Sequence, residues 1–466
     1  DQHGEIQFAA SKQSCRVIDA TWGVVEELSD GSETMSAFKF LEKLVDRGDF
    51  IGIQGELFYT HKWELTIFVT NFQLLSKAIM PLPEKFHGLE DQETRYRKRY
   101  LDMAMNNEVF DVLIFRSRFI QVLREFYWKH GFYELDTPVL WSSASGAAAK
   151  PFKTYHNDFD QEFYLRICSE TELKKATVGG FEKNFVFGTN FRNEGSDPSH
   201  MQEFMMLEHQ NVYKTFYEDM DFTEKMFDHI FTELELNRKV IVEGKEWNTK
   251  EVNFSTPWPR IDYVEWVNEA SGLDIASYGI DDADKLRSDI RSKGIEFEGM
   301  DKMGTMTLID YLYKKVLRPK IAWPAFIYNY PRILAPLARI SDKDPNRCEK
   351  WQVVVNWWEI INSYGELVDP VAQLSSFDEQ AKAEAWGDEE ATSADNAFVQ
   401  AMEYGMPGQA GFGMGIDRIV ALLKGQKNLR DAVLFPLVRP EQVKKSAKQL
   451  EKEYRAKKII MIADES

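Results

Sequence analysis

The sequence lacks the features that would place it in a membrane or outside the cell. None of its apolar runs reaches the roughly 20 residues that a membrane-spanning helix needs, and no signal-peptide pattern opens it. Its three cysteines, Cys15, Cys168 and Cys348, are odd in number and far apart, which argues against a disulfide framework. We therefore expect a cytoplasmic protein with no membrane span.

Two common site patterns are also missing. The eight histidines show no HExxH or similar spacing, so no zinc site is expected. There is no GxxxxGK loop, so a chain that uses ATP would have to hold its phosphates with side chains. The formal net charge of −18 argues against an extended nucleic-acid surface, because phosphate contacts come from Lys and Arg. A local basic strip on an acidic protein could still bind RNA.

The 466 residues, 44% of them hydrophobic, allow two or three domains with sizeable cores. Residues 1–78 show short strand-like runs around one helical stretch, roughly Met35–Leu44. This pattern predicts a small barrel of the OB type. The strand-like runs are Ile6–Phe8, Phe50–Ile53 and Leu65–Val69.

Residues 79–108 read as a connector, which begins with the structure-breaking Pro81-Leu82-Pro83. Basic and aromatic side chains alternate in the strip Arg95–Tyr100. One interpretation is a helix that faces solvent or a second subunit. The other is a contact with an RNA backbone.

A larger domain is expected over 109–440. It should open with a long amphipathic helix that ends near His130-Gly131, and the run Glu134–Leu140, with its internal Pro138, is strand-like. Residues 183–213 read as two strands joined by a charged turn, and about 214–350 as a helical insertion. Residues 351–369 and 409–437 return to strand-like runs, and 441–466 form a charged tail.

Two arginines are placed as phosphate binding without a glycine-rich loop would require. Arg192 ends one strand of the 183–213 hairpin, and Arg418 follows the alternating glycines of Gly411–Gly415. Small residues let a ligand approach the backbone closely, and a planar guanidinium can grip phosphate with two hydrogen bonds. Each arginine alone would more often belong to a surface salt bridge or a turn.

Taken together and in this order, these segments resemble the three signature motifs of class II aminoacyl-tRNA synthetases. Motif 1 would run from about 109 through Pro138, motif 2 from Phe191 to Phe204, and motif 3 from Gly413 to Arg418. The resemblance implies an α+β fold, with an antiparallel sheet flanked by helices and preceded by the OB-type barrel.

The class resemblance implies roles in binding ATP. Arg192 would hold the α-phosphate and stabilise the charge that develops there, and Arg418 would hold the γ-phosphate, so both are catalytic candidates. Glu194 would accept from the adenine amino group and Phe204 would stack on the ring. His200 and Gly415 complete the implied ATP site.

Three acidic residues suit a substrate that carries an ammonium group into a partly dry pocket: Glu170, Glu208 and Glu366. Each alone could equally be a solvated acid. The chain also resembles lysyl-tRNA synthetases over nearly its whole length. This resemblance rests on Pro81–Gly88, Arg95–Arg97, Arg99–Asp102, Gly146–Phe152, Val178–Lys183 and Leu434–Pro436.

This resemblance implies that the chain uses ATP, Mg²⁺, L-lysine and tRNA(Lys). Glu170 and Glu366 would take the lysine amino groups, Asn362 and Arg192 would face its carboxylate, and Gly146 and Ala147 would form a loop over it. Glu208 would complete the lysine site. Glu359 would ligate Mg²⁺, Gln7 and Glu64 would read the anticodon, and the motif 1 helix would pair two copies in a homodimer.

The chain departs from the family pattern in several places. Gln352 stands where a second Mg²⁺ carboxylate is usual, Gln210 where a tyrosine is usual, and Val368 where an asparagine is usual. We expect the family's first barrel strand to lie upstream of Asp1, and the tail beyond Pro440 to extend past the usual family end. Two alternatives stay open: an aspartyl- or asparaginyl-type synthetase, and a synthetase-like binding protein without enzymatic activity.

Overall fold

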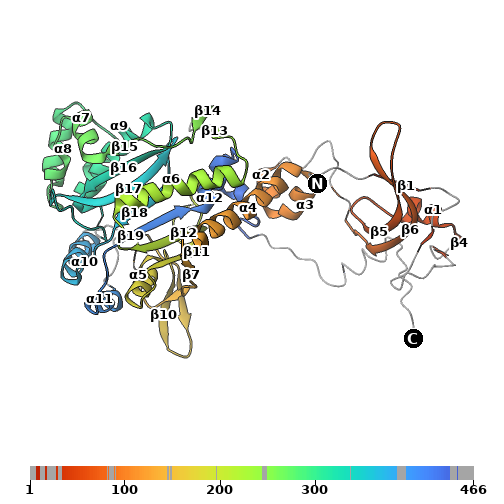
Figure 1. Ribbon diagram of the computed structural model, residues 1–466, viewed down its shortest axis with the longest axis horizontal. Helices are drawn as coiled ribbons and strands as arrows, with labels where there is room; N and C mark the ends of the chain where they lie inside the picture. Colours follow the sequence, from red (N-terminus) through yellow and green to blue (C-terminus); the bar gives the residue numbers. More distant parts are fainter. Residues whose placement is uncertain are drawn as a thin grey trace. The chain divides into compact units, whose positions relative to one another are not determined.

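The chain forms two compact units, residues 1–108 with 438–466, and residues 109–437 (Figure 1). The computed structural model describes residues 7–10, 16–17, 28–29, 34–80, 82, 89, 91–143, 146, 149–195, 197–243, 249–335, 337–385, 395–440 and 449. Cys15, Ala147 and all of the charged tail 441–466 except Gln449 lie outside the described residues.

The first unit is organised around one long strand, β6 (Leu65–Ser76). It pairs antiparallel with β5 (Phe50–Tyr59) and parallel with β1 (Gln7–Ala10) and β2 (Arg16–Val17). The predicted strand-like runs are thus confirmed as strands, whereas the OB-type closure of the barrel stays a prediction. A short hairpin, β3 (Leu28–Ser29) with β4 (Thr34–Met35), completes the strands described in this unit.

The predicted helix of the first unit is confirmed as α1 (Ala37–Leu44). It begins at Ser36 because the serine side chain accepts a hydrogen bond from the backbone NH of Lys39. Its apolar face packs on Val69 and Phe72 of β6, which are almost fully buried.

The connector forms two short helices, α2 (Gln92–Arg97) and α3 (Arg99–Met105). Arg95 Nε lies 2.9 Å, and Arg99 Nη1 3.1 Å, from the buried carboxylate of Asp102. Tyr96 is buried as well. The basic strip is therefore partly internal, and two of its cations are neutralised within the unit.

The second unit is built on an eight-stranded sheet. Its inner strands pair antiparallel, and only the two outermost pairs, β15 with β16 and β7 with β11, are parallel. The α+β class is therefore confirmed. In spatial order the strands are β15 (Arg260–Asp262), β16 (Ala325–Pro331), β17 (Arg347–Val355), β18 (Trp358–Gly365), β19 (Gln409–Gly415), β12 (Glu203–Val212), β11 (Lys183–Phe191) and β7 (Tyr133–Glu134).

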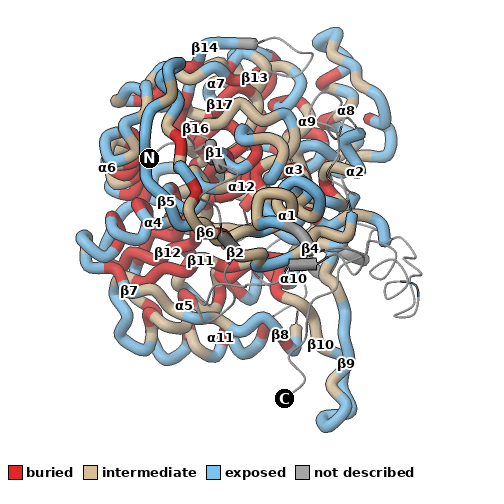
Figure 2. Tube along the Cα trace, turned by 90° about the vertical axis from the view of Figure 1, so that its right-hand side faces the viewer, coloured by how far each residue is buried: buried red, intermediate tan, exposed pale blue. Residues whose placement is uncertain are grey.

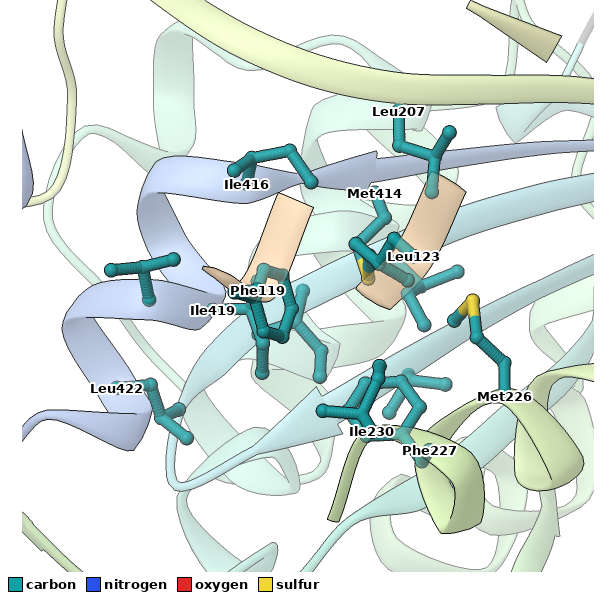
Figure 3. Close-up of a cluster of buried hydrophobic side chains, with 14 of the residues drawn as sticks. Phe119, Leu123, Leu207, Met226, Phe227, Ile230, Met414, Ile416, Ile419 and Leu422 are labelled. Atoms are coloured by element: carbon teal, nitrogen blue, oxygen red, sulfur yellow. The ribbon is translucent and has the colours of Figure 1, made fainter. Parts of the chain in front are cut away.

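One face of this sheet is covered by three helices, α4 (Asn107–Lys129), α6 (Phe216–Glu233) and α12 (Ile416–Leu423). Figure 3 shows their apolar side chains meeting those of the sheet: Phe119 and Leu123 from α4, Met226, Phe227 and Ile230 from α6, Ile416, Ile419 and Leu422 from α12, and Leu207 and Met414 from the strands. The helix predicted to end near His130 is confirmed as α4, which stops one residue earlier.

A buried polar network lies inside this otherwise apolar layer. His209 of β12 contacts the Tyr127 hydroxyl through Nδ1 at 2.8 Å and Asp219 through Nε2 at 3.0 Å. Ser363 of β18 donates to the other oxygen of Asp219 at 3.4 Å, and Phe412 stacks on the imidazole. Because a buried polar group is costly without partners, this network fixes how α4 and α6 sit on the sheet.

The remaining helices and strands of the second unit surround this sheet. The hairpin of β9 (Lys153–His156) and β10 (Gln161–Leu165) pairs with β8 (Leu140–Trp141) and projects from the unit (Figure 2). The others are α5 (Glu170–Val178), β13 (Lys239–Glu243), β14 (Thr249–Asn253), α7 (Tyr263–Ser271), α8 (Ala283–Ser292), α9 (Thr305–Val316), α10 (Pro370–Ala385) and α11 (Asn396–Glu403).

Two expectations differ from the structure. The run Glu134–Leu140 is not one strand: β7 ends at Glu134 and β8 begins at Leu140, because Pro138 has no NH to offer a strand partner. The segment 214–350 is not purely helical either, since β15 and β16 extend the main sheet and β13 and β14 form a hairpin. Among the described residues, no helix is long and apolar enough to cross a membrane.

Candidate active site

The site face of the sheet lies opposite the three-helix core, and strand alternation explains its composition. In β19, Ala410, Phe412 and Met414 are buried, and the glycines between them face the other way. Gly413 pairs with Glu208 on one side and with Asn362 on the other, and Asn362 pairs with Gln352. Predicted site residues from β12, β18 and β17 therefore lie in one row across a glycine strand.

A second row runs parallel to the first, through Gly411. It joins Gln210 of β12 to Tyr364 of β18. A Cβ on Gly411 would lie 1.8 Å from Glu366 Oε1 and 2.7 Å from Gln210 Nε2. Glycine is required here because the carboxylate of Glu366 lies across the strand.

Two arginines lie at one end of the strands that these rows cross. Arg192 continues the hairpin, with its NH 2.8 Å from the Gln202 carbonyl, and its guanidinium lies 5.1 Å from the centre of the Phe204 ring. Arg418, in the first turn of α12, donates to the carbonyl oxygens of Glu359 at 2.5 Å and Ser199 at 3.4 Å. The structure thus gathers three of the predicted ATP residues.

Two arginines and two carboxylates act electrostatically on Arg418 at this end. Burial lowers the pKa of Arg418, Glu359 opposes this effect, and the nearby cations Arg318 and Arg192 lower the pKa further. Sequence reasoning did not find Arg318, which lies in no recognised motif. A bound anion would relieve the mutual repulsion of these groups, as a triphosphate does.

The turn between β11 and β12 carries Glu194 and His200, both exposed. Its shape is fixed by Asp197, which accepts from the Ser199 hydroxyl and lies 2.8 Å from His200 Nδ1. Burial acts against ionisation of Asp197, but the hydrogen bonds from Ser199 and His200 prevail and lower its pKa to about 2. The Glu194 carboxylate remains at the surface beside the arginine end.

The opposite end of these strands holds carboxylates. Glu170 opens α5, and Glu366 follows β18; both lie within 2.6 Å of the same ammonium group, that of Lys174. Gln210 Nε2 donates to the other oxygen of Glu366 at 3.0 Å. The role of Lys174 was not predicted, although the Glu170–Lys174 spacing of four in a helix is a usable signal for half of the contact.

Glu208 lies between these ends and is held by the protein itself. Its oxygens accept from the Ser169 NH at 2.9 and 3.1 Å and from Asn190 Nδ2 at 2.9 Å. Burial raises its pKa to about 7, although these hydrogen bonds act in the opposite direction. The residue therefore anchors the start of α5, where Glu170 stands.

The predicted metal pair is unequal. Tyr330 donates to the Gln352 amide oxygen at 2.8 Å, and the Gln352 amide nitrogen lies 3.4 Å from Asn362 Oδ1. Asn362 in turn donates to the Tyr364 hydroxyl at 2.5 Å. Both polar atoms of the Gln352 amide are therefore used in a series of side-chain hydrogen bonds that runs from Tyr330 to Tyr364. Glu359 is half-buried, and its carboxylate suits a hard cation.

Among the described residues, no group of three or more His, Cys, Asp and Glu side chains could hold a metal. A single carboxylate fits Mg²⁺ only when substrate phosphates complete its coordination. The donor set at Glu359 therefore fits a metal that arrives with a nucleotide, and not a metal held by the protein alone.

Three further predictions involve residues outside the rows. Gly146 is buried with φ +88°, and a Cβ there would lie 2.5 Å from Cys168 Sγ, so this loop position needs glycine. Val368 packs beside Phe377 and Phe398 in a small apolar cluster. In the first unit, Gln7 pairs with Thr66, two residues from the exposed Glu64, which brings the two anticodon candidates to one part of that sheet.

A family model for class II tRNA synthetases (D, K and N) matches residues 91–439, the whole sheet and both arginine segments included. The antiparallel sheet with Arg192 and Arg418 at one end agrees with that match. The chain belongs to the class II tRNA synthetases.

Comparison with curated relatives shows to which members of this class the chain is similar. The chain is 41% identical to a lysine--tRNA ligase of Aquifex aeolicus over 88% of its own length and 67% of the relative's. It is 38% identical to the lysine--tRNA ligase of Wolinella succinogenes, over 94% and 85% of the two chains. It is also 38% identical to lysine--tRNA ligase 2 of Methanosarcina mazei, over 87% and 77%. Within its class the chain therefore groups with the lysine--tRNA ligases.

Proposed function

We propose that the chain activates L-lysine with ATP and transfers the lysyl group to the 3′ end of tRNA(Lys). The observation that supports this best is the polarity of one sheet face, which has cations at the Arg192–Arg418 end and carboxylates at the Glu170–Glu366 end. A triphosphate and an amino acid with two ammonium groups complement these two ends.

In the first step a lysine carboxylate oxygen attacks the α-phosphorus of ATP. A bond from that oxygen to phosphorus forms, the bond to the bridging oxygen breaks, and pyrophosphate leaves with the electron pair. Arg192 stabilises the negative charge that develops on the α-phosphate, and Phe204, beneath it, stacks on the adenine. Arg418 holds the γ-phosphate, and His200 and Gly415 border the nucleotide.

The amino acid lies over the glycine rows. Glu170 and Glu366 receive its amino groups, Asn362 and Arg192 face its carboxylate, and Gly146 belongs to the loop beside it. Glu208 acts through Ser169 to hold Glu170 in place. Because the reaction requires little covalent help, positioning and charge neutralisation by these residues supply the rate.

Glu359 would hold Mg²⁺ together with the ATP phosphates, and the bound metal would neutralise phosphate charge. Gln352 offers at most a neutral oxygen that Tyr330 already uses. We propose further that two copies pair through α4, that Gln7 and Glu64 contact the anticodon, and that the enzyme works in the cytoplasm.

The test is amino-acid-dependent exchange of pyrophosphate into ATP. Exchange with lysine, and none with aspartate or asparagine, is expected. Exchange with aspartate or asparagine alone would replace the proposal with the related synthetase type. No exchange with any amino acid would favour a binding protein without enzymatic activity.

A further inference from the structure

The amino-acid end of the site already contains an ammonium group. Lys174 Nζ lies 2.6 Å from Glu170 Oε1 and 2.5 Å from Glu366 Oε2, and its side chain has no exposed surface. The ammonium group also lies 5.7 Å from the centre of the Phe398 ring of α11. An isolated charge could not be buried in this way, but two carboxylates and an aromatic face compensate it.

This arrangement leaves the substrate little vacant space at Glu366. One oxygen of Glu366 accepts from Gln210 at 3.0 Å, and the other is paired with Lys174. Under the proposed function, the same carboxylate receives a substrate amino group. A second ammonium group at Glu366 would lie beside that of Lys174, and like charges at such short distances repel.

We propose that Lys174 is a specificity-determining residue, a built-in competitor whose ammonium group L-lysine must displace from Glu366. This inference rests on the proposed function. The competition lowers the affinity for lysine, and it also excludes uncharged amino acids of similar length, which cannot replace the lost ion pair. The energy of lysine binding is thus a difference between two similar ion pairs.

The electrostatic surroundings agree with this geometry. Burial alone would lower the pKa of Lys174, but Glu170 and Glu366 outweigh it, and the pKa is raised above its usual range. Lys174 is therefore charged at neutral pH. The other titratable groups on which these two carboxylates act are Cys168, Glu208 and Tyr364.

The experiment measures L-lysine binding by titration calorimetry in wild type, Lys174→Gln and Lys174→Met, at pH 7 and pH 8.5. Lys174→Gln keeps NH donors for both carboxylates without the charge, and Lys174→Met keeps the length and the contact with Phe398. We expect lysine to bind at least about tenfold more tightly to the variants. The gain should be larger at pH 8.5, because one of two unpaired carboxylates takes up a proton near neutral pH.

Norleucine, which lacks the terminal ammonium group, is the second probe, and its affinity should not rise in either variant. Lys175→Met is the matched control, because Lys175 is the next residue of α5 and pairs with Glu172 at 2.8 Å near the surface. ATP binding, measured in parallel, should be the same in all four proteins.

Lysine binding that is equal or weaker in Lys174→Gln at both pH values would overturn the inference, whether or not Lys174→Met folds. A gain shared by norleucine would also overturn it, since relief of strain and not of charge competition would then be the cause. If wild type binds lysine and exchanges pyrophosphate but the variants gain nothing, the inference alone fails. If wild type does neither, the proposed function fails with it.

Discussion

The two ends of the site carry charges of opposite sign and compensate them differently. At the arginine end, Arg192 and Arg318 lower the pKa of Arg418, and Glu359 and Asp197 raise it. The side-chain contacts of Arg192 and Arg418 go to carbonyl oxygens and an aromatic ring. At the carboxylate end, one ammonium group, that of Lys174, is paired with both Glu170 and Glu366. The first end gathers cations, and the second holds two carboxylates that share one internal cation.

This difference shows where ligand binding should stabilise the protein and where it should merely exchange partners. Under our proposals, a nucleotide would add negative charge at the arginine end, and an amino acid would replace an ion pair that already exists. Four substitutions test whether the two ends differ in this way.

Arg192→Ala should lower the rate of pyrophosphate exchange by about 10²–10³-fold, because it removes a cation aimed at the charge that develops on the α-phosphate. The lysine dissociation constant should change much less. Single-turnover kinetics with saturating lysine and ATP check this. An equal loss in lysine affinity would show that the two ends are not separate.

Gly411→Ala should damage the carboxylate end. Its Cβ would lie 1.8 Å from Glu366 Oε1, so the carboxylate has to move. Such overpacking costs about 1–3 kcal/mol, or about 5–150-fold in the KM for lysine, with the KM for ATP nearly unchanged. Gly408→Ala is the control, because no atom lies within 4 Å of its Cβ position. A matching effect of the control would refute the explanation.

Glu208→Gln should change the pH dependence of stability. The folded chain holds the Glu208 proton up to about pH 7, well above the ordinary carboxyl value of 4.5. The wild type therefore loses stability as pH rises between those values. The Glu208→Gln variant, which mimics the protonated form, should lose less stability than the wild type over the same pH range. Thermal unfolding from pH 5 to pH 8 measures the slopes, with Glu203→Gln, exposed on the same strand, as control. Parallel slopes in all three would contradict the assignment.

Of the four substitutions, Gln352→Glu should change the measured behaviour least. Residue 352 lies between the arginine end and the carboxylate end of the site. A carboxylate there would remain within reach of the Tyr330 hydroxyl and add a charged oxygen near Glu359. The Mg²⁺ concentration that half-saturates ATP binding should fall by a few fold, because an added charged ligand raises the affinity of a site for the cation. An unchanged Mg²⁺ dependence would place the metal away from residue 352.

Much of this fold could be predicted from the sequence, because the residue patterns that indicate a helix, a strand or a hairpin lie within single elements. The hairpin around Arg192, the glycine alternation before Arg418 and the helix α4 all follow from short spacings. The sequence could not show that β18 and β12 both flank β19, and this neighbourhood brings Glu366 to Gln210.

Contacts that depend on sheet order were beyond the sequence for the same reason. The Lys174–Glu366 ion pair joins α5 to the end of β18, and His209, on a strand read as apolar, is satisfied by Tyr127 and Asp219 from two helices. Hydrophobic periodicity carries no information on such partners. The strands β15 and β16 were missed because they are embedded in a region that otherwise reads as helical.

The glycines of β19 alternate with Phe412 and Met414, so one strand presents glycines on the site face and large side chains to the core. A slip of one residue against β12 would turn the large side chains into the pocket and the glycines into the core. Such an error would cost activity and stability together. A chain with this register error should therefore be less stable as well as inactive.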